Sequence, residues 1–180
     1  YPPTAEQMKD LKKKNHVSMI AMCESNFKAD KLPGIKAKII KTPKDKKPLL
    51  IPYISAGMVV MPAQALYDVP FDPYLSFLFF GEEILHSARL WTAGYNFYAP
   101  VIPFVIHHYG RKGKPKFWSD NKKYGNCRKK AITRVKKILN YEKIKVDPEY
   151  SKSLEKYGLG KKRSLKDYFE FTKIDIENKK

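Results

Sequence analysis

The order of apolar and polar positions in the first sixty residues predicts buried strands. Residues 16–24 (HVSMIAMCE) are mainly apolar and contain no Gly or Pro, which is typical of a strand in a core. Residues 28–48 are punctuated by Lys, Pro and Gly, so we expect a surface excursion that holds one short strand at 37–41. Residues 49–60 predict a second buried strand region, interrupted by a proline and by three small residues.

Helical signals replace these runs further along the chain. Residues 62–69 begin with Pro, which suits the first turn of a helix. A Pro-rich loop at 70–80 leads into a helix at about 81–93, and two Glu lie in its first turn, where the helix dipole favours anions. Gly94 stands where a C-terminal cap belongs. Residues 96–110 then predict one or two short strands that end in paired histidines.

The character of the chain changes after residue 110. Residues 111–137 carry twelve Lys and Arg against a single acid, Asp120. Helical spacing of apolar residues at 126–140 predicts an amphipathic helix with a basic outer face. A final helix is expected within 156–175, capped by Ser164 and burying Leu165, Tyr168 and Phe169. Strands and helices therefore mix throughout, and the predicted class is α/β.

Length and composition fit one folded domain of 180 residues with 43% apolar residues. Cys23 and Cys127 are too few and too far apart for a disulfide framework or a zinc pattern, which makes a reducing compartment the default. The most apolar region, residues 49–69, is interrupted by Pro, Gly and Asp, so no membrane span is expected. Because the first residue is Tyr1 rather than Met, we expect a fragment or a processed form.

A net charge of +18 suggests a polyanionic partner, but the composition argues against specific nucleic-acid binding. The 36 basic residues include only five Arg, and the aromatic residues gather in apolar segments rather than among the lysines. Lys, Ile, Asn and Tyr are all plentiful, which is typical of an A/T-rich genome that fills solvated positions with Lys. A basic surface would also suit a phosphate-bearing donor.

Candidate chemistry is concentrated at residues 77–100 (FLFFGEEILHSARLWTAGYNFYAP), an apolar and aromatic stretch with three charged side chains. Charge in such surroundings is costly unless it is paired or takes part in chemistry. Glu82 and Glu83 could simply exploit the start of a helix, and Arg89 could form a nearby ion pair. Glycine-rich phosphate loops and nucleophile elbows are absent from the sequence.

The histidines and Trp91 also have ordinary structural interpretations. His86 follows Glu82 by four residues and shares a helix face with it and with Arg89. His107 and His108 would point in opposite directions on a strand, and an inward histidine is more often a hydrogen-bonded core residue than a ligand. Trp91 suits a core better than a sugar platform. Each of these signals is weak when taken alone.

Together, however, the motifs resemble a known enzyme family. Most of residues 48–175 is similar to the acceptor half of the GT-A glycosyltransferases that attach α-linked N-acetylglucosamine (GlcNAc) to hydroxyproline, in the known case on a cytoplasmic ubiquitin-ligase adaptor. The similar elements are Ser55-Ala56-Gly57-Met58, PFDP at 70–73, FFGEE at 79–83, RLWTAGY at 89–95, the Ala-Pro step at 99–100, HHYGR at 107–111 and the tail YGLGKKRSLKDYFEFTKID. Mucin-type N-acetylgalactosaminyltransferases share a more distant series of Gly-Glu, Arg, Trp, Gly and His.

The resemblance implies roles for several residues. Glu82 is expected to hydrogen-bond the donor sugar or the acceptor hydroxyl, with Glu83 beside it and Arg89 orienting one of these carboxylates. His107 is expected to complete the coordination of Mn²⁺ or Mg²⁺, with His108 as the fallback, and the metal would hold the diphosphate of a UDP-sugar. Substrate contacts are expected from Ser55, Ala56, Gly57, Phe80, Gly81 and Trp91.

The implied protein is a cytoplasmic retaining glycosyltransferase that moves a sugar, GlcNAc by resemblance, from UDP to a hydroxyl of a protein or glycan acceptor. Residues 1–110 would form the C-terminal portion of a GT-A domain, a mixed sheet flanked by helices, and residues 111–180 a basic helical extension packed on it. The family's Asp-x-Asp metal motif lies N-terminal to a YPP segment, and this chain begins at YPP. The alternatives are a non-catalytic GT-A-like module that binds a glycan or protein, and a basic nucleic-acid-binding protein.

Overall fold

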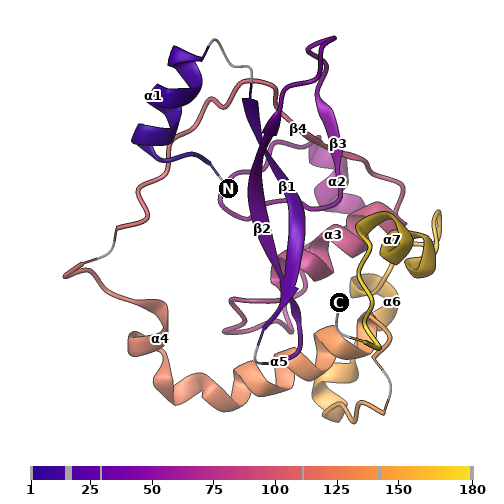
Figure 1. Ribbon diagram of the computed structural model, residues 1–180. Coiled ribbons are helices and arrows are strands. Elements are labelled where there is room, and N and C mark those ends of the chain that lie inside the picture. Colours follow the sequence, from indigo (N-terminus) through magenta and orange to yellow (C-terminus); the bar gives the residue numbers. More distant parts are fainter. Residues whose placement is uncertain (1, 15–17, 29, 111, 142, 179–180) are drawn as a thin grey trace.

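The computed structural model describes residues 2–14, 18–28, 30–110, 112–141 and 143–178 (Figure 1). Its elements in chain order are α1 (Ala5–Lys13), β1 (Ser18–Phe27), β2 (Pro33–Lys41), β3 (Leu49–Ile51), α2 (Ala63–Asp68), α3 (Glu82–Thr92), β4 (Phe97–Ala99), α4 (Phe117–Asp120), η1 (Lys122–Tyr124), α5 (Gly125–Ile138), η2 (Pro148–Ser151), α6 (Leu154–Tyr157) and α7 (Leu165–Thr172).

The longest strands, β1 and β2, form an antiparallel hairpin that runs through the middle of the molecule (Figure 1). Its register pairs Ser18 with Lys41 and Phe27 with Pro33. The predicted strand at 16–24 is therefore found at 18–27, and residues 16 and 17 lie outside the described residues. The strand predicted at 37–41 is confirmed as the second half of β2, but the surface excursion around it is wrong. The nine-residue β2 begins already at Pro33 and pairs with β1, since proline is tolerated at the first position of a strand.

A second, smaller sheet pairs β3 with β4, with Leu49 opposite Ala99. The strand region predicted at 49–60 is correspondingly reduced to three residues, because Pro52 lacks the N–H that would continue the ladder. The strands predicted at 96–110 are likewise reduced to β4, and two further prolines follow it. The backbone N–H of His107 donates instead to the carbonyl of Pro3, at 2.9 Å.

The helix predicted at 81–93 is observed as α3, which packs against β2, α5 and α7. Gly81 begins it with a left-handed backbone (φ 106°), and a Cβ there would lie 2.6 Å from Cδ1 of Leu32. Eight of its eleven residues are buried, whereas Glu82, Glu83 and Trp91 keep partial exposure. This helix is the central element of the fold because it touches both the hairpin and the C-terminal part of the chain.

The two longest C-terminal helices agree with the prediction from the sequence, whereas the short helices α4 and α6 were not predicted. The amphipathic helix expected at 126–140 is α5, and the final helix is α7, which begins with a reciprocal capping box between Ser164 and Asp167. Tyr168 is fully buried, while Leu165 and Phe169 are half-buried against the same core. The α/β class is confirmed as a mixed fold of small antiparallel sheets flanked by helices, compatible with part of a GT-A-like domain. Among the described residues, no helix is long and apolar enough to cross a membrane.

Candidate functional site

Residues 55–58 form a tight turn that is hydrogen-bonded to the N-terminal part of α3. The Glu83 carboxylate accepts a hydrogen bond from the backbone N–H of Ala56 at 2.9 Å. Ser87, one helical turn later, donates to the Glu83 carbonyl at 2.7 Å and accepts from the N–H of Ile54 at 3.0 Å. Two hydrogen bonds, from Ala56 and Ile54, therefore join the turn region to the start of α3. They bring together the turn residues 55–57 and the carboxylates 82 and 83, which were predicted to belong to one site.

The two neighbouring carboxyl groups are both half-buried. Burial raises the pKa of Glu82, and the negative charge of Glu83 raises it further. Burial also raises the pKa of Glu83, but the hydrogen bond from Ala56 opposes that rise. Among the described residues, the Glu82 carboxyl group makes no hydrogen bond or ion pair, so it is the member of the pair that is left for a ligand.

A third segment, residues 107–109, is connected to the 55–58 turn indirectly. Pro2, near the N-terminus, contacts both of them, and the neighbouring Pro3 contacts His107. A Cβ on Gly57 would lie 3.6 Å from Cδ of Pro2. The Tyr109 hydroxyl donates to the Pro2 carbonyl at 2.8 Å, in addition to the bond from His107 to Pro3. The start of α3 (residues 81–83), the 55–58 turn and the histidine segment (residues 107–109) thus follow one another in space. We call these three segments the row.

The predicted metal ligand His107 stands in this row without companion ligands. Its ring packs 4.1 Å from the ring of Tyr109, and its Nδ1 is buried with no hydrogen-bond partner. His108 is exposed, and Arg111 of the same motif lies outside the described residues. No group of three or more His, Cys, Asp or Glu that could hold a metal occurs in the described part of the chain. These residues therefore supply one imidazole and not a complete metal site.

An apolar groove of about 460 Å³ opens beside the turn. Ser55 lines it, and the Ser55 hydroxyl is buried without a hydrogen-bond partner in the described structure. Among the described residues, no charged side chain lines the groove, whose other walls include Pro2, Pro3, Val60, Phe97 and Phe104. The groove can therefore bind apolar or neutral groups next to the carboxylates, but it offers no charge to a phosphate.

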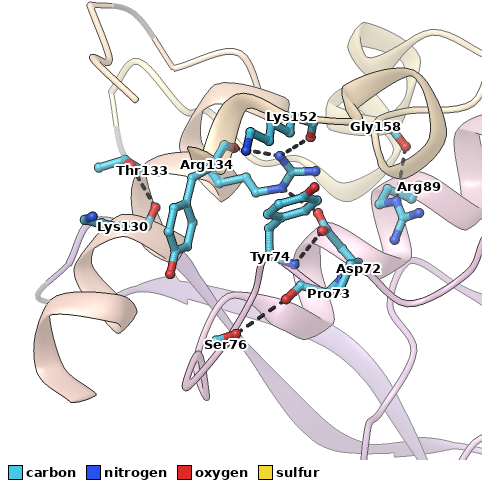
Figure 2. A network of polar contacts seen from close by, with 11 residues as sticks. Asp72, Pro73, Tyr74, Ser76, Arg89, Lys130, Thr133, Arg134, Lys152 and Gly158 are labelled. Carbon is cyan, nitrogen blue, oxygen red and sulfur yellow. Dashed lines mark hydrogen bonds and ion pairs between the residues drawn. The ribbon is translucent and has the colours of Figure 1, made fainter. Parts of the chain in front are cut away.

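The expectation that Arg89 orients Glu82 or Glu83 is wrong. Its Nε donates to the carbonyl of Gly158 at 3.1 Å, and the guanidinium lies near Asp72 rather than the helix start (Figure 2). Seven residues separate Arg89 from Glu82, which is about 10 Å along a helix axis. Burial lowers the pKa of Arg89, and the charge of Asp72 opposes that change. Arg89 thus binds the C-terminal part of the chain to α3.

His86 is buried on α3, with 3% of its surface exposed. Its ring stacks on Phe71 with the centroids 4.6 Å apart, and its Nε2 has no hydrogen-bond partner in the described structure. Burial, assisted by the charge of Arg89, lowers the pKa of His86 to about 4. The imidazole is therefore neutral at pH 7 and belongs to the packing of α3.

The predicted substrate contacts separate into two groups. Phe80 and Gly81 precede Glu82 directly, and the Phe80 ring is 38% exposed. Trp91 lies at the other end of α3, between the Arg163 guanidinium at 4.8 Å and the Tyr168 ring at 5.6 Å. Its ring faces are used for packing against the C-terminal part of the chain, so Trp91 lies apart from the carboxylates.

A buried ion pair between Asp72 and Arg134 was not predicted from the sequence (Figure 2). Their side chains are fully buried and meet at 2.7 Å, and Arg134 also donates to the carbonyls of Tyr150 and Lys152 at 2.6 and 2.9 Å. The pair ties the loop that precedes α3 to α5 and to the segment after it. The available signals were an acid between two prolines and an arginine on the apolar face of a helix.

Comparison with known protein families finds a match over nearly the whole chain. A family model described as "Glycosyltransferase (GlcNAc)" covers residues 1–178. Searches against curated proteins and against solved structures return no significant match.

Proposed function

Because the chain belongs to the GlcNAc glycosyltransferase family, we propose that it transfers GlcNAc from UDP-GlcNAc to a hydroxyl group of a protein, with retention of the anomeric configuration. The observation that carries this proposal is the half-buried Glu82 carboxyl group, which has no partner among the described residues and stands beside a turn fixed by Glu83. A carboxylate in such a place can bind a sugar or acceptor hydroxyl through charge-assisted hydrogen bonds.

Each residue of the row has a distinct task in this proposal. Glu82 accepts a hydrogen bond from the donor sugar or from the attacking hydroxyl and so orients it. Glu83 acts as a positioning residue, because its bond to Ala56 sets where the turn and the helix start face one another. Glu82 is not assigned as a nucleophile, since in similar retaining enzymes the donor's own phosphate is thought to assist attack from the same face.

We include a divalent ion, Mn²⁺ or Mg²⁺, in the proposal because a departing diphosphate needs a cation. His107 would be one ligand through its unpartnered Nδ1. The described residues place no second and third protein ligand beside it, so no step is assigned to the ion. A protein acceptor modified on a hydroxyproline and a cytoplasmic location follow from the resemblance, and the unpaired Cys23 and Cys127 agree with a reducing compartment.

Release of UDP from UDP-GlcNAc, with water as the acceptor, tests the proposal without knowledge of the natural acceptor. Glu82→Gln should lower this rate by about 10²-fold or more, because the reacting groups lose a charge-assisted hydrogen bond that orients them. Glu155→Gln is the matched control, since Glu155 is an exposed carboxylate on α6, and it should leave the rate unchanged. An unchanged rate in Glu82→Gln would contradict the assignment. Binding of UDP-GlcNAc without any release of UDP by the wild type would favour a non-catalytic module.

A further inference from the structure

The loop before α3 presents a group of aromatic rings to solvent, directly beside Glu82. Phe79 and Phe80 are 48% and 38% exposed. The ring of Phe79 meets that of Phe80 edge-on at 5.1 Å and that of Phe117, from α4, at 5.6 Å. Contiguous exposed aromatic surface in a folded protein marks an interaction site more often than chance.

One residue of this loop, Phe77, has a strained backbone. Phe77 has a left-handed backbone (φ 57°), a conformation that bulky side chains rarely adopt. Its ring stacks on Tyr124 of η1, with centroids 3.8 Å apart and planes 8° from parallel. Strain of this kind persists only where the surroundings enforce it, and it gathers at functional segments. The exposed rings are therefore preorganised before any partner arrives.

Lysine side chains frame these rings. The Lys28 ammonium lies 5.7 Å from the centre of the Phe80 ring, and the Lys123 ammonium lies 5.0 Å from that of Tyr124. Lys116, at the start of α4, is also exposed, and Asp120 is the one acid in the described part of 112–137. We call this set the aromatic–lysine surface, and it consists of Lys28, Phe77, Phe79, Phe80, Phe117, Lys123 and Tyr124.

We propose that the aromatic–lysine surface docks an acidic stretch of the polypeptide acceptor, next to the residue whose hydroxyl is modified. The inference rests on the proposed function, because Phe80 precedes Glu82 by two residues. When the hydroxyl residue of the acceptor lies at Glu82, the neighbouring residues of that peptide therefore lie across the exposed rings. Aromatic faces bind the apolar parts of those residues, and the lysines pair with Asp or Glu and steer the encounter.

The observations favour an acidic peptide over other partners. A neutral glycan would use the rings but not the ammonium groups. A nucleic acid would use both, but it carries a phosphate at every unit and would set one against Glu82 and Glu83. A peptide can present a neutral hydroxyl residue at the carboxylates and place its acids only where the lysines lie.

Fluorescence anisotropy on the full chain tests this surface with two labelled 15-residue peptides. Both have the same central hydroxyl residue, and their flanks contain either Asp and Glu or Asn and Gln. The acidic peptide should bind at least tenfold more tightly at low salt, with the preference falling as salt is added. The double variant Lys28→Gln/Lys123→Gln should reduce its affinity at least fivefold. Lys12→Gln/Lys13→Gln, with the same charge change on exposed residues of α1, should reduce it less than twofold.

A second pair of variants tests the contribution of the aromatic rings. Phe79→Ser should weaken binding of both peptides, whereas Tyr67→Ser, at a residue of α2 that is 81% exposed, should not. Thermal unfolding checks that each variant is folded. Equal losses in the two lysine variants would overturn the proposal, since diffuse charge would then explain the binding. Tighter binding of a 15-nucleotide oligouridine or of a neutral oligosaccharide would overturn it as well.

Failure of this inference can be told apart from failure of the proposed function. Peptide binding is measured without a sugar donor, and UDP release is measured without a peptide. Loss of the acidic preference with UDP release intact would overturn the docking surface alone. An intact preference without UDP release would support the surface and overturn the transferase.

Discussion

At the scale of single residues, burial determines which groups near α3 carry charge. Glu82 keeps a raised pKa and no partner among the described residues, whereas the neighbouring Glu83 is held by Ala56. His86, one turn later, is almost fully buried and has its pKa lowered to about 4. The same helix therefore presents one group prepared for a ligand and one group whose neutrality the fold requires.

The lowered pKa of His86 predicts a pH dependence of stability. The unfolded chain binds a proton at about pH 6.5, but the folded chain does so only near pH 4, so stability is lost as pH falls between these values. Between pH 7 and 5 the loss is about 2 kcal/mol, from 1.36 kcal/mol per pH unit below 6.5. His86→Phe keeps a ring against Phe71 and removes the titration. Urea unfolding at both pH values should show a smaller decrease in the variant, and equal decreases would contradict the burial argument.

At the scale of elements, contacts from the C-terminal part of the chain fix both ends of the segment that carries the site. Asp72 and Arg134 hold the loop before α3 (Figure 2). At the other end, the N–H groups of Lys162 and Arg163 donate to the Thr92 carbonyl at 2.9 and 3.1 Å, and that of Gly160 donates to the Thr92 hydroxyl at 2.8 Å. The position of Glu82 thus depends on residues more than fifty positions away in the sequence.

Removing one partner of the buried ion pair should be costly. Asp72→Asn leaves the Arg134 guanidinium buried without its counter-charge, and about 3–5 kcal/mol of unfolding free energy should be lost. The control Asp45→Asn removes an exposed pair with Lys47, whose nitrogen lies 3.8 Å away, and should cost about 0.5 kcal/mol or less. Urea denaturation measures both. Similar costs for the two variants would mean that Asp72 does not hold the loop.

Gly160 should be equally intolerant of a side chain, for a steric reason. A Cβ there would clash with the backbone nitrogen of Ala93, at the end of α3. Gly160→Ala should therefore push the C-terminal segment off the helix and lower the midpoint of thermal unfolding. Gly125→Ala is the matched control, because Gly125 has φ −56° at the start of α5 and open space around its Cα. A midpoint that is lowered in Gly125→Ala but not in Gly160→Ala would contradict the close contact between Gly160 and Ala93.

Local signals in the sequence predicted the elements whose boundaries are marked by local chemistry. Glycines and acids marked α3, and Ser164 marked α7. The helix α1 was overlooked although Thr4 and Gln7 form a capping box, and β2 was misjudged because Pro33 was taken as a breaker. The partners of Arg89 and Asp72 could not be predicted, because they depend on contacts between distant segments and not on spacing.

At the scale of the whole molecule, the basic C-terminal region and the residues before it share one hydrophobic core. Buried Val135, Tyr168 and Ile174 belong to the same cluster as Met19 and Leu85. In the described part of the chain, many of the lysines that contribute to the net charge of +18 lie exposed around this core, and they include Lys123 of the aromatic–lysine surface. The aromatic–lysine surface beside Glu82 would attract anions, which agrees with the acidic acceptor proposed for it.

In the proposed function, the start of α3 and the 55–58 turn bind the sugar donor. Amide chemical shifts of the ¹⁵N-labelled chain, recorded during titration with UDP-GlcNAc and Mg²⁺, test it most directly. We expect the largest changes on Ala56, Gly57, Gly81 and Glu82, and Glu82→Gln should reduce them. Changes confined to the lysines of α5, or no changes at millimolar donor, would contradict it.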